Sequence, residues 1–181
     1  MNPKYAHGYD ALAFAYKALG DINGAVYAWE KYVGLQENRL VGYLNLLLDL
    51  HELGDQQRLF SAAEKAIPLY ERHIRLNSDD FSAHVDFANV LNWANRKSEA
   101  MMMAEALAEM KSLDGFTLYN LGCLFLATGS HDRGMDILQR AVTAGFRNID
   151  VFLHDPDLIP VRGREDFQKL LEDLIGKLSE A

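Results

Sequence analysis

Four turn signals divide this chain at a regular spacing. Gly20-Asp21 and Gly54-Asp55 each follow an apolar helical pattern, and an interval of about 34 residues separates the two turns. Gly129-Ser130 is a third turn of this kind, and Asn95-Arg96 precedes it by the same interval. Glycine and asparagine are the residues that best tolerate the left-handed conformation at a helix end. The spacing therefore indicates stacked helical hairpins, each of which buries an apolar face against its neighbours.

The best-formed copy of the unit runs from Leu118 to Phe146. Its apolar and small residues follow the pattern Leu118-x2-Leu121-Gly122-x2-Phe125, and then Gly134-x3-Leu138. This pattern resembles the tetratricopeptide repeat (TPR), a helix-turn-helix unit of about 34 residues. The resemblance implies an all-α fold: a right-handed TPR superhelix, or α-solenoid, of about four helix-turn-helix repeats plus C-terminal capping helices.

We expect a single TPR domain over 1–181. Its repeats are predicted at about 4–37, 40–76, 79–112 and 115–146, and its C-terminal capping segment at 147–181. Repeat two departs from the family pattern at Leu47 and Leu59, which are large where a small residue is usual. The helix packing in repeat two is therefore expected to differ from the ideal unit, with a more open angle.

Repeat two is also longer than the period. The interval from Gly54 to Asn95 exceeds one repeat by about 7 residues. Such an insertion is about two helical turns, or roughly 10 Å of helix. We assign it to one long second helix at about 56–76, kinked near Pro68 because proline removes a backbone hydrogen bond. The alternative is that Pro68 begins a separate helix, but residues 65–67 carry no turn signal.

The period stops after Phe146. Asp155-Pro156 is a helix start, residues 157–159 give one short turn, and Pro160 is expected to end it. A final amphipathic helix is predicted from Arg164, with one apolar stripe formed by Phe167, Leu170, Leu171, Leu174 and Leu178. This tail resembles those that close TPR arrays in many bacterial proteins. Such a cap covers the outer apolar face of the last repeat.

The N-terminus resembles a boundary between two repeats, because Asn-Pro-x-Tyr is how a TPR array passes from one unit to the next. No capping helix is expected before it, so the first helix should expose a face that suits a neighbour. One hypothesis is that the sequence is the C-terminal portion of a longer array, with Met1 added as a start codon. A short natural protein is the alternative.

Composition narrows the classes of partner. The formal net charge is −8, and no basic stripe supplies the clustered Lys and Arg that nucleic acids or anionic membranes require. The sequence has one cysteine, Cys123, so an intramolecular disulfide is excluded. We expect Cys123 to be a buried apolar residue, with a reactive thiol as the alternative. Neither a signal peptide nor a membrane-spanning run is evident, so a cytoplasmic protein is predicted.

The sequence carries no recognisable catalytic motif. It contains neither a phosphate-binding glycine loop nor HExxH nor CxxC, and its 6 histidines are scattered. His154-Asp155-x-Asp157 can be drawn as a metal site, but a helix cap is the better interpretation of these residues. We therefore predict a protein that is not an enzyme, with no cofactor and no bound metal.

The resemblance places the binding surface on the first helix of each repeat. The helical stripe opposite the buried one predicts these peptide-groove candidates: Asp10, Phe14, Lys17, Leu44, Leu48, His51, Val85, Asn89, Asn92, Trp93, Tyr119, Cys123 and Leu126. Asn89 can hydrogen-bond both the N–H and the C=O of an extended peptide, while Trp93 and Tyr119 can hold an apolar side chain. The alternative for Phe14, Leu44 and Leu48 is packing against adjacent helices.

Three functions remain open on the sequence. The first is a non-catalytic protein-interaction scaffold that binds a peptide or a helix in its concave groove. Asp10 and Phe14 replace the Lys-Asn pair of carboxylate-clamping TPR domains, so a chaperone-type clamp is not expected. The second is the C-terminal regulatory or sensor array of a larger bacterial signalling enzyme of the cyclase or kinase kind. The third is a homo-oligomer formed through the N-terminal face.

Met101, Met102 and Met103 either fill gaps between repeats or form a recognition surface.

Overall fold

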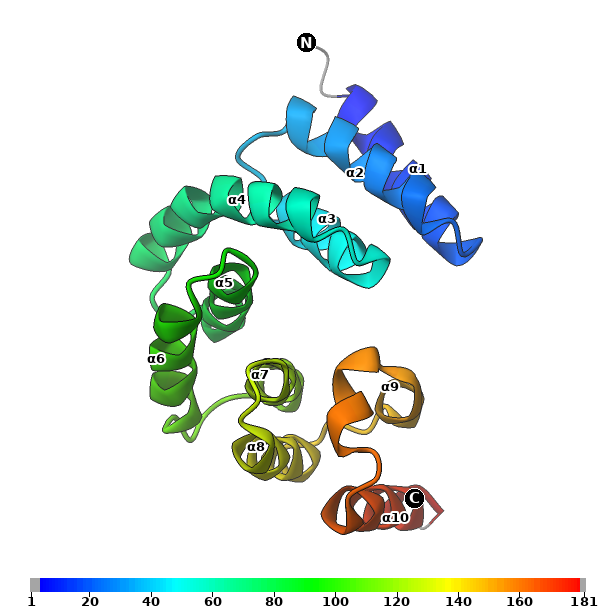
Figure 1. Ribbon diagram of the computed structural model, residues 1–181, viewed down its shortest axis with the longest axis vertical. Helices are drawn as coiled ribbons and strands as arrows, with labels where there is room; N and C mark the ends of the chain where they lie inside the picture. Colours follow the sequence, from blue (N-terminus) through cyan, green and yellow to red (C-terminus); the bar gives the residue numbers. More distant parts are fainter. Residues whose placement is uncertain (1–3, 180–181) are drawn as a thin grey trace. The chain divides into compact units, whose positions relative to one another are not determined.

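The computed structural model describes residues 4–179, with side chains from residue 6 to residue 176, and within this range every regular element is a helix (Figure 1). Met1 and the side chain of Leu178 lie outside the described residues. None of the described helices is both long and apolar enough to cross a membrane. The elements are α1 (Lys4–Ala18), α2 (Ile22–Leu35), α3 (Leu40–Leu53), α4 (Gln56–Leu76), α5 (Phe81–Trp93), α6 (Lys97–Ala108), α7 (Gly115–Ala127), α8 (His131–Thr143), α9 (Ile149–His154), the 3-10 helix η1 (Pro156–Val161) and α10 (Glu165–Ser179).

The chain divides into two compact units, which are described separately below. Unit 1 consists of Met1–Asp79 and Val90–Arg96, and unit 2 consists of Asp80–Asn89 and Lys97–Ala181. Unit 1 contains α1 to α4 and the end of α5. Unit 2 contains the start of α5 and all elements from α6 onward.

The four predicted turns adopt the left-handed conformation. The backbone angle φ is 74° at Gly20, 73° at Gly54, 86° at Gly129 and 58° at Asn95. A positive φ costs little at glycine and is tolerated by asparagine, which explains why these residue types recur at the period. In the first two turns the following aspartate caps the next helix. Asp21 Oδ1 accepts a hydrogen bond from the N–H of Gly24 at 2.8 Å, and Asp55 does the same for Arg58. The turn prediction is confirmed.

Unit 1 is built from two helical hairpins. Helix α1 packs on α2, α2 also contacts α3, and α3 packs on α4. Helix α4 is a single helix that continues through Pro68, as predicted, and its ribbon curves along its length (Figure 1). Leu47 and Leu59 are both buried, so the two large residues of repeat two lie within the packed core. Other core side chains of this unit include Ala13, Ala25, Trp29, Leu50, Ala63 and Tyr70.

Unit 2 has its closest helix contact between α7 and α8. A Cβ atom at Gly122 would lie 2.8 Å from Leu138 Cδ2, and one at Gly134 would lie 2.4 Å from Leu126 Cδ2. Only glycine allows the two helices this close an approach. Met101 and Met103 of α6 pack against the same core, whereas Met102 is 75% exposed. Met101 and Met103 therefore fill gaps in the core, and Met102 does not.

The C-terminal segment is part of the core of unit 2. Phe152, Leu158, Val161 and Phe167 are almost completely buried in one cluster with α7 and α8. Helix α9 was not expected from the sequence. Pro160 does not end the short turn, because η1 continues to Val161. The predicted final helix is present as α10, and its stripe residues Phe167, Leu170, Leu171 and Leu174 are buried.

Candidate peptide-binding face

In unit 1, helix α3 carries an apolar stripe that faces solvent. Val41 is 53% exposed and Leu48 is 44% exposed, while Leu44 lies between them and is half-buried. The spacing of three and four residues places these side chains on one helical face. Tyr43, Leu46 and Leu50 occupy a different face of the same helix and are buried. We call Val41, Leu44 and Leu48 the α3 stripe. Val41 was missed in the sequence, although it lies three residues before Leu44.

The groove candidates of α1 differ from one another in exposure. Phe14 is 56% exposed, and its ring makes an edge contact with Trp29 at a centroid distance of 5.3 Å. It therefore packs against α2 and still presents apolar surface. Asp10 is half-buried.

Lys17 is committed to an ion pair. Its ammonium binds Asp49, which is only 2% exposed, and also Glu52 at 3.0 Å. Burial alone lowers the pKa of Lys17, but the hydrogen bonds and charges of the two carboxylates outweigh it, so the pKa lies above its usual value. The second carboxylate oxygen of Asp49 is buried and has no hydrogen-bond partner among the described residues. Lys17 thus links α1 to α3 and compensates a buried charge.

The end of α5 that belongs to unit 1 places an aromatic side chain beside α3. The rings of Trp93 and His51 lie 5.7 Å apart between centroids, with an angle of 37° between their planes. Trp93 and Asn92 are half-buried, and His51 is exposed. Trp93 and His51 are thus two groove candidates that the structure brings together.

In unit 2 the candidates on α5 are less accessible. Val85 is 1% exposed and belongs to the core cluster. Asn89 is half-buried, and its Nδ2 donates a hydrogen bond to the carbonyl oxygen of Val85 at 3.3 Å. One donor of the amide is therefore already used within the helix.

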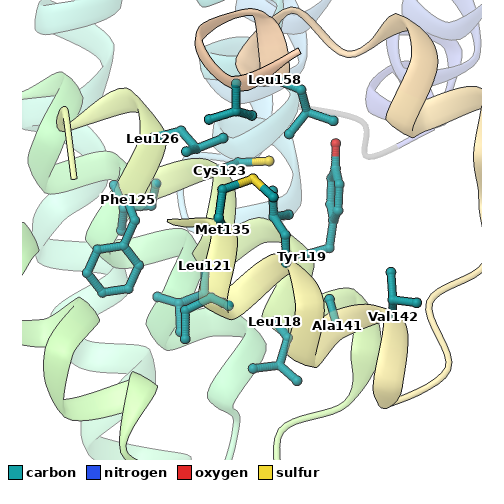
Figure 2. Close-up of a cluster of buried hydrophobic side chains, with 14 of the residues drawn as sticks. Leu118, Tyr119, Leu121, Cys123, Phe125, Leu126, Met135, Ala141, Val142 and Leu158 are labelled. Carbon is teal, nitrogen blue, oxygen red and sulfur yellow. The ribbon is translucent and has the colours of Figure 1, made fainter. Parts of the chain in front are cut away.

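The candidates on α7 are covered by the C-terminal segment. Tyr119 is 3% exposed, Cys123 7% and Leu126 2%, and Leu158 of η1 lies against them (Figure 2). The Tyr119 hydroxyl donates a hydrogen bond to Asp155 Oδ2 at 2.7 Å. This corrects the expectation that these three side chains face an open groove. The sequence indicated the correct helical face, but η1 packs on that face.

Comparison with known proteins places this geometry in a known fold. No protein-family model and no curated protein matches the sequence. Among solved structures, the ArsTM double mutant of MamA RS-1 is 16% identical, with 97% of each chain covered and a TM-score of 0.51. A structure of MamA from Desulfovibrio magneticus RS-1 that starts at residue 41 is 20% identical, with 97% of this chain and 93% of that chain covered and a TM-score of 0.48. YrrB, a TPR protein with an unusual peptide-binding site, is 14% identical, with 93% and 84% covered and a TM-score of 0.45.

Three observations lead to one conclusion. They are the repeated hairpins, the regular spacing of the turns, and the match to the MamA double mutant over nearly the whole chain. The chain has the TPR fold. The fold is an all-α solenoid of helical repeats, as the pattern at Leu118–Phe146 predicted.

One charged residue near the groove candidates of this TPR fold was missed in the sequence. Asp86 of α5 is half-buried and forms neither an ion pair nor a hydrogen bond with any described residue. Burial, with a smaller contribution from the charge of Asp80, raises the pKa of Asp86 to about 6. No sequence signal distinguishes Asp86 from a solvated helix residue, because its burial depends on tertiary contacts.

The sulfur of Cys123 lies near two carboxylates, but the group is arranged as a helix cap. The ligand atoms of Cys123, Asp155 and Asp157 come within 4.8 Å of one another. Both oxygens of Asp155 are occupied, since Oδ1 accepts from the N–H of Asp157 and Oδ2 accepts from Tyr119. Burial, followed by the two negative charges, raises the pKa of the Cys123 thiol well above its usual value. His154 does not belong to this group, and its Nδ1 contacts the carbonyl oxygen of Asp150.

Proposed function

We propose that this protein is a non-catalytic scaffold that binds a peptide or a helix of a partner protein. The observation that carries the proposal is the α3 stripe, where Val41, Leu44 and Leu48 form an apolar, partly exposed row on one face of a single helix. Exposed apolar surface of this kind is typical of protein interaction sites. Phe14 on α1 and the Trp93–His51 pair supply further apolar and aromatic groups within unit 1.

The mechanism is the burial of apolar side chains on a preformed helical surface. Helix-in-groove and extended-peptide recognition both use anchors spaced along one face, which the α3 stripe offers at positions 41, 44 and 48. Because α3 is held by α2 and α4, little conformational entropy is lost when a ligand binds.

A single substitution in the stripe tests this proposal. A photo-crosslinking amino acid at position 48 first identifies the partner, and its Kd is then measured against the wild type and against Leu48→Asp. We expect Leu48→Asp to weaken binding about tenfold or more, because a buried carboxylate without a partner is costly at an apolar contact. The matched control is Leu76→Asp, the same change at a 74% exposed position of α4. Equal affinities of wild type and Leu48→Asp would show that the stripe is not the binding face.

A second candidate, self-association through α1, is favoured by a specific observation. Leu12 of α1 is 37% exposed, and Leu19, in the turn directly after α1, is 81% exposed. We expect light scattering at two protein concentrations to give a molar mass that rises with concentration, and Leu19→Glu to reduce that rise. A protein that stays monomeric at both concentrations contradicts this candidate.

A further inference from the structure

Unit 1 contains a cleft on a different side of α3 from the α3 stripe. Its volume is about 650 Å³, within the range of sites that hold small ligands or short peptides. Buried side chains of α3, namely Tyr43, Leu46 and Leu50, form the floor, while α2 and α4 provide the two walls. The floor residues are spaced by three and four, so the cleft and the α3 stripe use separate faces of one helix.

The walls of the cleft carry opposite charges. Glu30 and Glu37 lie on the side of α2, and Arg58 and Lys65 lie on α4. Arg58 binds Glu30 across the opening at 2.8 Å, so these two charges compensate each other. In the described part of the chain, neither Glu37 nor Lys65 has an ion-pair partner. One carboxylate and one ammonium therefore remain available to a ligand on facing walls.

A polar group also lies at the floor. Tyr43 is 8% exposed, and its hydroxyl has no hydrogen-bond partner among the described residues. Burial, with a smaller contribution from Glu37, raises the pKa of Tyr43, so the phenol stays protonated and remains a hydrogen-bond donor. The hydroxyl oxygen itself is not fully buried, so it is accessible from the cleft and can donate a hydrogen bond to a ligand that binds there.

These features define the chemistry of the occupant. The Leu46 and Leu50 floor suits an aliphatic side chain, the Tyr43 hydroxyl suits a backbone carbonyl, and the two free charges suit one basic and one acidic group. We propose that the cleft between α2 and α4 is a second binding site, for a peptide segment whose apolar side chain lies between a basic and an acidic residue. The basic residue pairs with Glu37 and the acidic residue pairs with Lys65. This site does not depend on the α3 stripe.

The test uses the full chain labelled with ¹⁵N and the capped peptide acetyl-Ala-Lys-Leu-Glu-Ala-amide. We expect saturable chemical-shift changes, confined to amides of residues 30–38, 43–50 and 58–69, with a Kd of about 1 mM. Replacing the peptide's Leu by Ala, or its Lys and Glu both by Gln, should weaken binding at least about fivefold. These controls separate the apolar contact from the charge contacts.

Variants of the protein locate the site. Ser61 is exposed and lines the cleft, so Ser61→Trp should fill it and abolish the shifts without disturbing the core. Lys65→Glu should weaken binding at least about fivefold, and Tyr43→Phe about threefold. Lys97→Glu, at an exposed position of α6, is the control and should leave the Kd unchanged. The proposal is overturned if the peptide gives no saturable shifts at about 10 mM, or if Ser61→Trp binds it as well as the wild type.

Discussion

Replacing Phe152 by alanine is expected to destabilise the protein by about 3–5 kcal/mol. Phe152 is completely buried, and its ring contacts Tyr119 at 5.5 Å, Phe146 at 5.7 Å and Phe167 at 6.3 Å between centroids. It thus joins α9 to α7, to the segment after α8 and to α10. Truncation leaves a cavity among these rings and removes their edge contacts. In a chain of this size the midpoint of thermal unfolding should fall by about 10 °C.

The single cysteine gives this experiment a local readout. Cys123 is 7% exposed beneath η1, so in the wild type it should react slowly with a thiol reagent. Phe152→Ala should strongly increase the rate at which Cys123 reacts with the thiol reagent, because loosening of α9 and η1 uncovers the sulfur. Leu153→Ala, the neighbouring position at 45% exposure, is the matched control and should change the stability by less than about 1 kcal/mol. If Phe152→Ala matches this control in both measurements, the C-terminal segment is not part of the core of unit 2.

The parts of the fold that local chemistry decides were predictable from the sequence. Gly20, Gly54 and Gly129 stand where the chain needs a positive φ, and Asn95 takes the same conformation at the expected position. The residue type alone indicates such a turn, because glycine adopts a positive φ at little cost. The long helix α4 followed from counting residues between turns, since the extra length had only one amphipathic segment to occupy.

The candidate site was predicted less well, because it depends on contacts between distant residues. The helical period identified the face of α7 that carries Tyr119 and Cys123, but the period does not reveal what packs on that face. Asp155 lies 36 residues from Tyr119, and it accepts the Tyr119 hydrogen bond that ties the C-terminal segment to this face of α7. In the same way Lys17 pairs with Asp49, 32 residues away. Helix α9 has only six residues, which is too short to show a period, and it is anchored by Phe152.

Replacing Asp86 by asparagine is expected to stabilise the protein by about 2–3 kcal/mol at neutral pH. The pKa of Asp86 is about 6 in the folded protein, raised by burial and then by the charge of Asp80, whereas an unfolded aspartate titrates near pH 4. Below about pH 4 the carboxyl group is protonated in both the folded and the unfolded state, so its ionisation does not affect the stability of the wild type. Between about pH 4 and 6 only the unfolded state releases the proton, so the wild type loses stability as the pH rises. Above about pH 6 the penalty is complete.

The pH profile separates this effect from a general improvement in packing. Urea unfolding at several pH values between about 4 and 8 should show the advantage of Asp86→Asn growing through the interval from about 4 to 6 and then levelling off. An amide of the same shape carries no charge, so its burial costs much less than burial of the ionised carboxylate, and its cost does not depend on pH. The control is Asp136→Asn in the middle of α8, where the carboxylate is exposed and the change should stay within about 0.5 kcal/mol at every pH. An advantage of Asp86→Asn that is the same at pH 4 and pH 7 would mean that the charge of Asp86 is not the cause.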